Sequence, residues 1–295
     1  MAAAAPAQPT AHIIPARPWA ERARRVLVYV LLLAVAALFF TPFFWSVSTS
    51  LKTLQESVRG FDLFPDHPSL AAYRNALGDF NFARFAANSA ILAVVVTLSN
   101  LLLASIGGYA FARLRFPGRD VLFMLVLACL MIPDQLRLVP VYQMLIDFPL
   151  FGWNLISTYQ GFVAINLVTA TNLFLMRQYF VTIPKDYEEA AKLDGAGYFK
   201  TYWKVMLPLA GPALAAVTIL QFQGTWNEFF WALIILQDES KFTLPIGISN
   251  FVGVYNTQWP ELMAASVIAI LPVAAIYVVF QRYFVAGVAA AGIKG

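Results

Sequence analysis

The chain has 295 residues, of which 60% are apolar and 12% charged, and its mean hydropathy is +0.68. A soluble domain of this length needs far less apolar side chain, so the composition excludes an ordinary soluble protein and indicates one solvated by a lipid bilayer. The net charge of +4 does not indicate nucleic-acid binding, because Lys and Arg lie in short clusters between apolar runs, as membrane orientation requires.

Residues 1–25 are rich in Ala and Pro and end in a basic cluster of Arg22, Arg24 and Arg25. We predict a flexible cytoplasmic arm here. The apolar segment 26–47 is about twice as long as a signal-peptide core and ends without a clear small-residue cleavage site. It therefore predicts an uncleaved first span.

Six apolar segments are long enough to cross the hydrocarbon core, which takes about 20 residues. They are 26–47, 85–112, 121–145, 155–176, 212–236 and 262–284. We therefore predict an all-α polytopic membrane protein with about six transmembrane helices. The predicted membrane domain covers 26–284, and a cytoplasmic tail covers 285–295.

The third of these segments is the least regular. Two prolines and two charged residues interrupt it: Pro133, Asp134, Arg137 and Pro140. Because proline breaks helices and charges are costly in lipid, we expect a short span over 121–132 followed by a broken interfacial segment.

The positive charges predict the orientation. With six spans, the arm, the loop at 113–119, the loop at 177–211 and the end of the chain from Arg282 on carry four, three, five and two Lys or Arg residues, fourteen of the 20 in the chain. The positive-inside rule then places both termini in the cytoplasm of a multi-pass plasma-membrane protein.

No motif for catalysis or metal binding is found in the sequence. Cys129 is the single cysteine, and His12 and His67 lie outside the apolar runs. The patterns G-x-x-x-x-G-K-[ST], G-x-S-x-G and H-E-x-x-H are absent. We therefore expect no catalytic residue, no metal site and no cofactor on this chain.

The loop 177–211 is the longest predicted cytoplasmic loop, and its composition favours two short helices. Thr182 is expected to cap the first helix, with Pro184 in its first turn and acids near its N-terminus. Gly195 supplies a stop. The second helix is expected from about residue 197 to 207, ending before Pro208.

The sequence EEAAKLDGAGYFKTYWKVMLPLAGPA resembles the EAA loop of binding-protein-dependent ABC importer permeases. The segments 107–119, 131–144, 226–233 and 282–295 are also similar to that family, and the resemblance is closest to its carbohydrate branch, that of the maltose permease subunit. On this resemblance eight residues are assigned to ATPase coupling: Glu188, Glu189, Ala190, Ala191, Asp194, Gly195, Leu207 and Pro208.

The resemblance implies that residues 184–193 form a coupling helix in a groove of a cytoplasmic ATPase subunit. ATP and Mg would be bound by that partner. The implied assembly joins this chain to a second permease subunit, two ATPase subunits and an extracytoplasmic solute-binding protein. Both a heterodimeric and a homodimeric permease agree with the pattern. The implied solute is a carbohydrate, and glycerol phosphate or a polyol suits the same family.

A polar and small stripe repeats at helical spacing in the run ILQFQGTWNEFFWAL; it consists of Gln221, Gly224, Thr225 and Glu228. Gln223 and Asn227 share another face. One hypothesis is that Gln221, Asn227 and Glu228 line the solute path, since a carboxylate in lipid must face the bundle or water. The alternative is that Asn227 and Glu228 connect the spans by interhelical hydrogen bonds. The second and fourth spans contain further amides that either bond a hydroxyl-rich solute or support the structure, namely Asn88, Asn100, Asn166 and Asn172.

An ion-coupled secondary carrier is the competing class. Such carriers use buried ionisable groups near the middle of the membrane and often show inverted repeats. Glu228 is the only good candidate for such a group, and no repeat is apparent.

Overall fold

A computed structural model describes residues 18–60, 62–78, 81–149, 152–253 and 256–292. These residues are helical, and they contain no β-strand beyond one isolated bridge between Phe148 and Trp153. The α-helices are α1 Pro18–Ser50, α2 Leu54–Arg59, α3 Ala71–Gly78, α4 Phe82–Arg113, α5 Arg119–Cys129, α6 Leu138–Ile146, α7 Tyr159–Asn166, α8 Ala170–Thr182, α9 Asp186–Leu193, α10 Tyr198–Thr201, α11 Leu207–Leu209, α12 Gly211–Trp226, α13 Phe230–Ile235, α14 Leu244–Ser249 and α15 Trp259–Gly292. Two short 3₁₀ segments lie at Asp134–Arg137 and Glu239–Lys241, and a π-helical turn lies at Tyr202–Met206.

The described helices give up to six membrane spans. Three are continuous, within α1, α4 and α15, and three are bent pairs. The pair of α5 with the segment Asp134–Ile146 bends by 102°, α7 with α8 by 41°, and Tyr198–Leu209 with α12 by 76°. The all-α polytopic prediction is therefore confirmed, and the interruption expected in the third span is the sharpest of the bends.

Four predicted boundaries differ clearly from the structure. The fourth span continues to Thr182, so the first six residues of the predicted loop 177–211 belong to α8. Helix α1 begins at Pro18, so residues 18–25 continue the first helix; the rest of the predicted arm lies outside the described residues. The fifth span ends at Trp226 and not at 236, since Asn227 leaves the helix and α13 starts at Phe230. Helix α15 continues to Gly292 and so includes much of the predicted tail.

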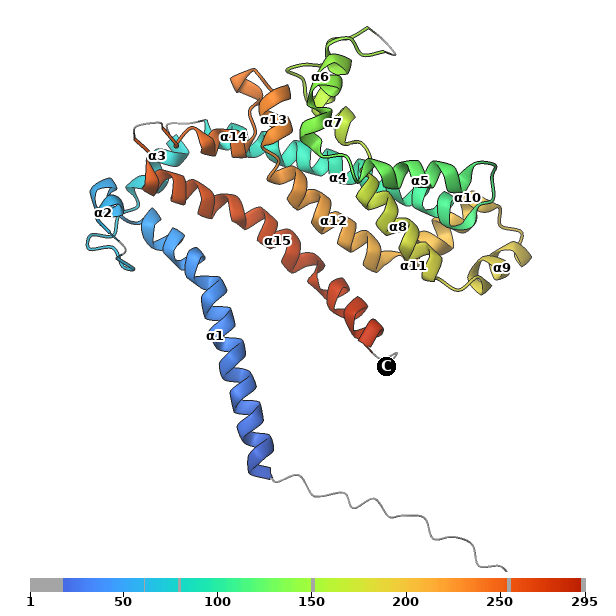
Figure 1. Cartoon of the computed structure of the whole chain (residues 1–295), viewed down its shortest axis with the longest axis horizontal. Helices are drawn as coiled ribbons and strands as arrows, with labels where there is room; N and C mark the ends of the chain where they lie inside the picture. The colour runs from blue at the N-terminus through green and yellow to red at the C-terminus, as the bar shows by residue number, and fades with distance from the viewer. Residues whose placement is uncertain (1–17, 61, 79–80, 150–151, 254–255, 293–295) are drawn as a thin grey trace, which may run out of the picture.

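Helix α4 is the central element of the fold. It lies beside α8 and α12, as Figure 1 shows, and buried side chains fill the space between them. Gly108 allows the closest approach, because a Cβ at this position would lie 2.7 Å from Cβ of Met176 and 2.8 Å from the backbone N of Arg177. A larger side chain than hydrogen does not fit between α4 and α8 here.

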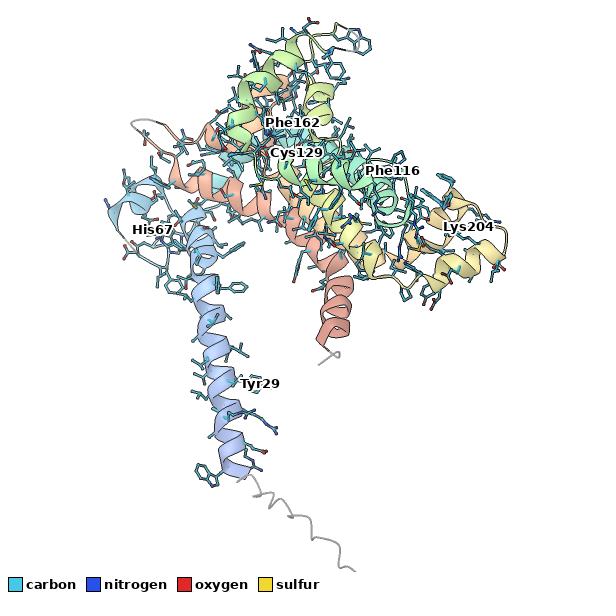
Figure 2. All side chains as sticks on the ribbon, turned by 45° about the vertical axis from the view of Figure 1, so that its right-hand side comes forward. Tyr29, His67, Phe116, Cys129, Phe162 and Lys204 are labelled. Carbon is cyan, nitrogen blue, oxygen red and sulfur yellow. The ribbon has the colours of Figure 1, made fainter. Side chains whose placement is uncertain are left out.

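Helix α1 behaves differently from the other spans. Its C-terminal residues 48–50 are buried, but the most apolar 18-residue stretch of the helix has none of its residues buried within the chain. Figure 1 shows the helix leaving the body near α2 and α15, and Figure 2 shows Tyr29 far from the remaining helices. The first span therefore packs against its own subunit only at one end.

Candidate functional site

The predicted helical hairpin forms at the far end of the bundle. Helix α9 ends at Leu193, and Gly195 takes a φ of +73° that closes the turn. Its N–H donates to the Lys192 carbonyl at 3.0 Å, and the Ala196 N–H donates to the Ala191 carbonyl at 2.9 Å. The predicted glycine stop is confirmed, because this left-handed conformation favours a residue without Cβ.

Two details of the hairpin correct the sequence prediction. Thr182 does not cap α9; it is the last residue of α8, and its hydroxyl donates to the Tyr179 carbonyl. The second helix does not end before Pro208 but continues to Leu209. A π-turn explains this, since the Leu207 N–H donates to the Tyr202 carbonyl five residues back and widens the helix just before the proline ring.

The hairpin divides the EAA-loop residues between a buried and an open side. Ala191 is buried, and Glu188 and Leu207 are half-buried. The others are exposed: Glu189, Ala190, Asp194, Gly195 and Pro208. Around them lie large apolar side chains that the chain itself leaves uncovered, namely Tyr187, Leu193, Tyr198, Phe199 and Trp203.

The open side of the hairpin therefore presents large exposed apolar side chains, which favour contact with another protein. Leu193 is 90% exposed and Phe199 75% exposed, and the Phe199 and Trp203 rings stack with centroids 6.4 Å apart. Lys204, which follows Trp203, lies in Figure 2 at the end of the molecule opposite His67. Exposed apolar surface of this kind marks an interaction site.

A buried amide network joins α4, α8 and α12. Asn100 donates to the Asn166 carbonyl at 2.8 Å and accepts from the Thr169 N–H at 2.9 Å. Asn172 Nδ2 lies 3.1 Å from the Asn100 oxygen and 2.6 Å from the Gln221 side-chain oxygen. These bonds join Gln221 of α12 to α8 and, through Asn172, to α4.

Glu228 lies apart from this network, because the helix that would have carried it ends two residues earlier. Its Oε1 accepts a hydrogen bond of 3.0 Å from the Trp231 N–H and so holds the start of α13. The expected stripe of Gln221, Thr225 and Glu228 is therefore interrupted. The only local signal of this break is the polar pair Asn227 and Glu228 inside an apolar run.

Glu228 lines a cavity of about 590 Å³ beside two broken spans and the end of a third. Two spans break, between α5 and α6 and between α7 and α8, and the fifth span ends where α12 gives way to α13. The polar or aromatic residues on its wall include Asp134, Arg137, Asn166, Thr169, Glu228 and Trp231. Irregular backbone at membrane depth is tolerated only where protein buries it or where it lines a watery cavity, so the breaks and the cavity belong together.

Two of these wall residues form an ion pair. Arg137 donates to Asp134, and both side chains are about half exposed, toward the cavity that they line. From the sequence these charges only interrupt a span, because their convergence with Glu228, 91 positions beyond Arg137, depends on the tertiary fold.

Asn227 faces a different cavity, of about 610 Å³, with Gln223 beside it. Phe43 of α1 and residues of α14 and α15 complete its wall. Asn227 and Glu228, two of the three predicted path residues, thus line two separate cavities.

Hydrogen bonds outside the spans hold the connection that follows α13 against Ser157. Lys241 donates to the Ser157 carbonyl at 2.6 Å, and the Asp238 N–H donates to the Ser157 hydroxyl at 3.0 Å. Hydrogen bonds from Ser240 lower the pKa of Asp238, and Lys241 acts in the same direction. The carboxylate therefore stays ionised near neutral pH and holds this turn.

The described part of the chain contains no group of three His, Cys, Asp or Glu side chains that could hold a metal ion.

Residues 100–290 match the family described as binding-protein-dependent transport system inner membrane component. The arabinooligosaccharides transport system permease protein AraQ of Bacillus subtilis is 33% identical over 276 residues, which is 92% of this chain and 96% of that protein. The trehalose/maltose transport system permease protein MalG of Thermococcus litoralis is 34% identical over 282 residues, 93% of this chain and 99% of that protein.

The fold is also similar to a solved structure, that of a bacterial ABC transporter involved in the import of the acidic polysaccharide alginate. The TM-score is 0.78 and the sequence identity 27%, with 92% of this chain and 99% of the compared chain covered.

Proposed function

Because the chain belongs to the family of binding-protein-dependent transport system inner membrane components, in which it is a permease subunit and not an enzyme, we propose that it forms part of the path for a neutral carbohydrate. The observation that carries this proposal is the cavity beside the helix breaks. The relatives named above import arabinooligosaccharides and trehalose or maltose by their descriptions, and alginate represents the acidic alternative.

The position of the cavity suits a solute path. At about 1.5 Å per residue, the 11 residues of α5, the 13 of α8 and the 16 of α12 place the breaks roughly 16 to 24 Å along each helix from the hairpin end. We propose that the hairpin end lies at the membrane surface, which puts the breaks within the hydrocarbon core of about 30 Å. Discontinuous helices form the solute sites of many transporters at this depth.

The charge of the cavity favours a neutral solute. Asp134 and Glu228 contribute two formal negative charges and Arg137 one positive charge, a net of −1. In a low-dielectric wall this charge repels a phosphate or uronate group. Carboxylate, guanidinium and amide groups bind sugar hydroxyls well, and the Trp231 ring offers an apolar face.

We expect Glu228→Gln to lower uptake of a neutral oligosaccharide about tenfold or more. The amide keeps an oxygen for the Trp231 N–H but loses the charge, and charge-assisted hydrogen bonds contribute about 1.5–3 kcal/mol. The measurement is ATP-dependent uptake of labelled arabinotriose and maltose into proteoliposomes containing the complete transporter. Glu239→Gln, which lies outside the cavity, is the matched control.

Glycerol 3-phosphate is offered in the same assay. Exclusion of this anion by the natural protein supports the neutral assignment, whereas uptake of the anion and none of either sugar would contradict it. Uptake driven by a proton gradient with no need for ATP would revive the secondary carrier.

The partners follow from the surfaces that the chain leaves uncovered. We propose that a homologous permease subunit packs on α1, since this apolar span packs on its own subunit only at one end. An ATPase subunit, which binds the ATP and Mg, is proposed to cover the apolar side of the hairpin. The family is binding-protein-dependent, and we propose that its solute-binding protein meets the opposite end, around α2 and α3.

The proposed orientation places both termini in the cytoplasm. The start of α1 and the end of α15 both lie away from α2 and α3 in Figure 1, as the positive-inside prediction requires. A cysteine-labelling experiment on intact cells, with a probe that does not cross the membrane, tests this. Labelling at position 66 near α2 and none at position 200 in the hairpin is expected.

We expect tagged protein, extracted from its native membrane in mild detergent, to retain a soluble ATPase and a second permease. Mass spectrometry of the co-purifying chains provides the measurement. Two copies of this chain with the ATPase would indicate a homodimeric permease, and reproducible recovery of this chain alone would argue against the importer assembly.

A further inference from the structure

We infer that Arg113 is a positioning residue that transmits a displacement of α9 to the membrane-spanning helices. This inference rests on the proposed function, because it takes α9 as the helix that an ATPase subunit moves. Arg113 is the last residue of α4, and Glu188 lies in the first turn of α9. The two elements are therefore joined by one pair of opposite charges.

The pair is buried but loosely made. The Nε of Arg113 lies 4.0 Å from the Oε1 of Glu188, and the side chains are 7% and 13% exposed. A charge-assisted hydrogen bond between such groups is about 2.7–2.9 Å long, so this is an electrostatic contact and not a formed bond. Both of these atoms are without a hydrogen-bond partner in the described part of the chain.

A second contact anchors the arginine while its charge partner stays loose. Another nitrogen of the same guanidinium donates to the carbonyl of Ile183, in the turn between α8 and α9. Arg113 is therefore fixed against the base of the hairpin, and Glu188 can approach it or leave it as α9 shifts by about an ångström. Buried unpaired charges are costly, so the tight and the loose arrangements differ appreciably in free energy.

The surroundings leave Glu188 no obvious second basic partner. Of the acids in the first turn of α9, Glu189 and Asp186 are exposed, whereas Glu188 faces inward. The guanidinium carbon of Arg177, the other arginine near this end, lies 4.1 Å from the centroid of the Phe123 ring. Arg113 is therefore the ion-pair partner of Glu188, and the Tyr109 hydroxyl, one turn earlier on α4, also interacts with this carboxylate.

Helix α4 is suited to carry the movement further. Tyr109, one turn before Arg113, packs against the rings of Phe180 and Tyr202 with centroids 5.7 and 5.3 Å away. The helix is continuous, and Asn100, the centre of the buried amide network, lies 13 residues before Arg113, about 20 Å along the axis. Thr169, which bonds to Asn100, also lines the cavity at the helix breaks.

The experiment uses the complete transporter with its ATPase, partner permease and binding protein in proteoliposomes, with arabinotriose and maltose as probes. Arg113→Gln is expected to keep basal ATP hydrolysis within twofold of the natural protein, and Glu188→Gln is compared with it by stimulation and by sugar transported per ATP. Stimulation of hydrolysis by loaded binding protein is expected to fall to the basal level, and sugar transported per ATP to fall at least tenfold. The double reversal Arg113→Glu with Glu188→Arg is expected to restore part of both.

Controls separate coupling from stability. Arg119→Gln removes a more exposed guanidinium, which pairs with Asp120. It should leave the coupling ratio, the sugar transported per ATP hydrolysed, unchanged. Arg113→Lys retains the charge and keeps the test valid if the glutamine variants fail to assemble; it is expected to keep more coupling than Arg113→Gln in any preparation that assembles. Single variants with a coupling ratio within twofold of natural would overturn the inference. If the natural complex itself shows no stimulation by loaded binding protein, the proposed function fails instead.

Discussion

Replacing Gly195 with valine is expected to abolish ATP-dependent uptake while the protein still inserts and accumulates in the membrane. Gly195 has a φ of +73°, which costs an ordinary L-residue about 1–2 kcal/mol and a β-branched residue more. No neighbouring atom would contact an added Cβ, so the strain is purely conformational. The turn would relax to another conformation and change the angle between α9 and the helix beginning at Tyr198.

The chain offers a closely matched control for this variant. Gly197 is two residues further on, has the same open surroundings, and takes an extended conformation with a φ of −73° that valine adopts freely. Uptake and ATP hydrolysis by Gly197→Val should stay near natural levels. If Gly195→Val transports normally, the orientation of α9 does not matter for coupling.

Replacing Gly108 with alanine is expected to lower the stability of the folded bundle by about 1–3 kcal/mol, the range for inserting a methyl group into a filled core. The new Cβ would lie 2.7 Å from Met176 Cβ and 2.8 Å from the backbone of Arg177, and backbone cannot move aside as a flexible side chain can. Helices α4 and α8 must separate. The midpoint of thermal unfolding of purified protein in detergent measures the loss.

Gly224→Ala is the same chemical change but is expected to have the opposite effect on the midpoint of thermal unfolding. Gly224 lies inside α12 with no atom within 4 Å of an added Cβ, so alanine should keep or raise the midpoint, by up to about 1 kcal/mol of helix propensity. Equal effects of the two substitutions would mean that the contact between α4 and α8 is not close in the membrane.

The hairpin and the cavity lie at a distance from each other, and this separation bears on how the subunit moves. The hairpin meets its proposed partner with exposed apolar groups, whereas the cavity that suits the solute lies roughly 16–24 Å away along the helices. Between them lie a continuous helix, α4, and a satisfied amide network that resists local distortion. A rigid connection of this kind favours movement of the helices as a body over melting of any one of them.

In the fifth span, the sequence pattern predicted the helix face correctly and the helix end wrongly. Periodicity correctly placed Gln221 and Thr225 on one face, since Gln221 donates to Thr225 at 3.0 Å. Hydropathy wrongly extended the helix to residue 236, because it averages over Asn227 and Glu228. It does not register that the Glu228 side chain accepts a hydrogen bond from the Trp231 N–H and so starts a new helix, α13. The end predicted before Pro208 was wrong for another reason: the preference against helix before proline does not foresee the π-turn that lets the hairpin helix continue to Leu209.

The sequence by itself predicted about six apolar spans, the glycine-closed hairpin and the family, since each can be read from local residue patterns. Apolar length is measured against a bilayer of fixed thickness, and a left-handed turn requires glycine wherever it occurs. Only the tertiary structure decided that Asp134, Arg137 and Glu228 share a cavity, that Asn100 connects α8 to α4, and that Arg113 faces Glu188. These contacts join residues that lie far apart in the chain, and no local pattern specifies which buried polar groups will find one another across packed helices.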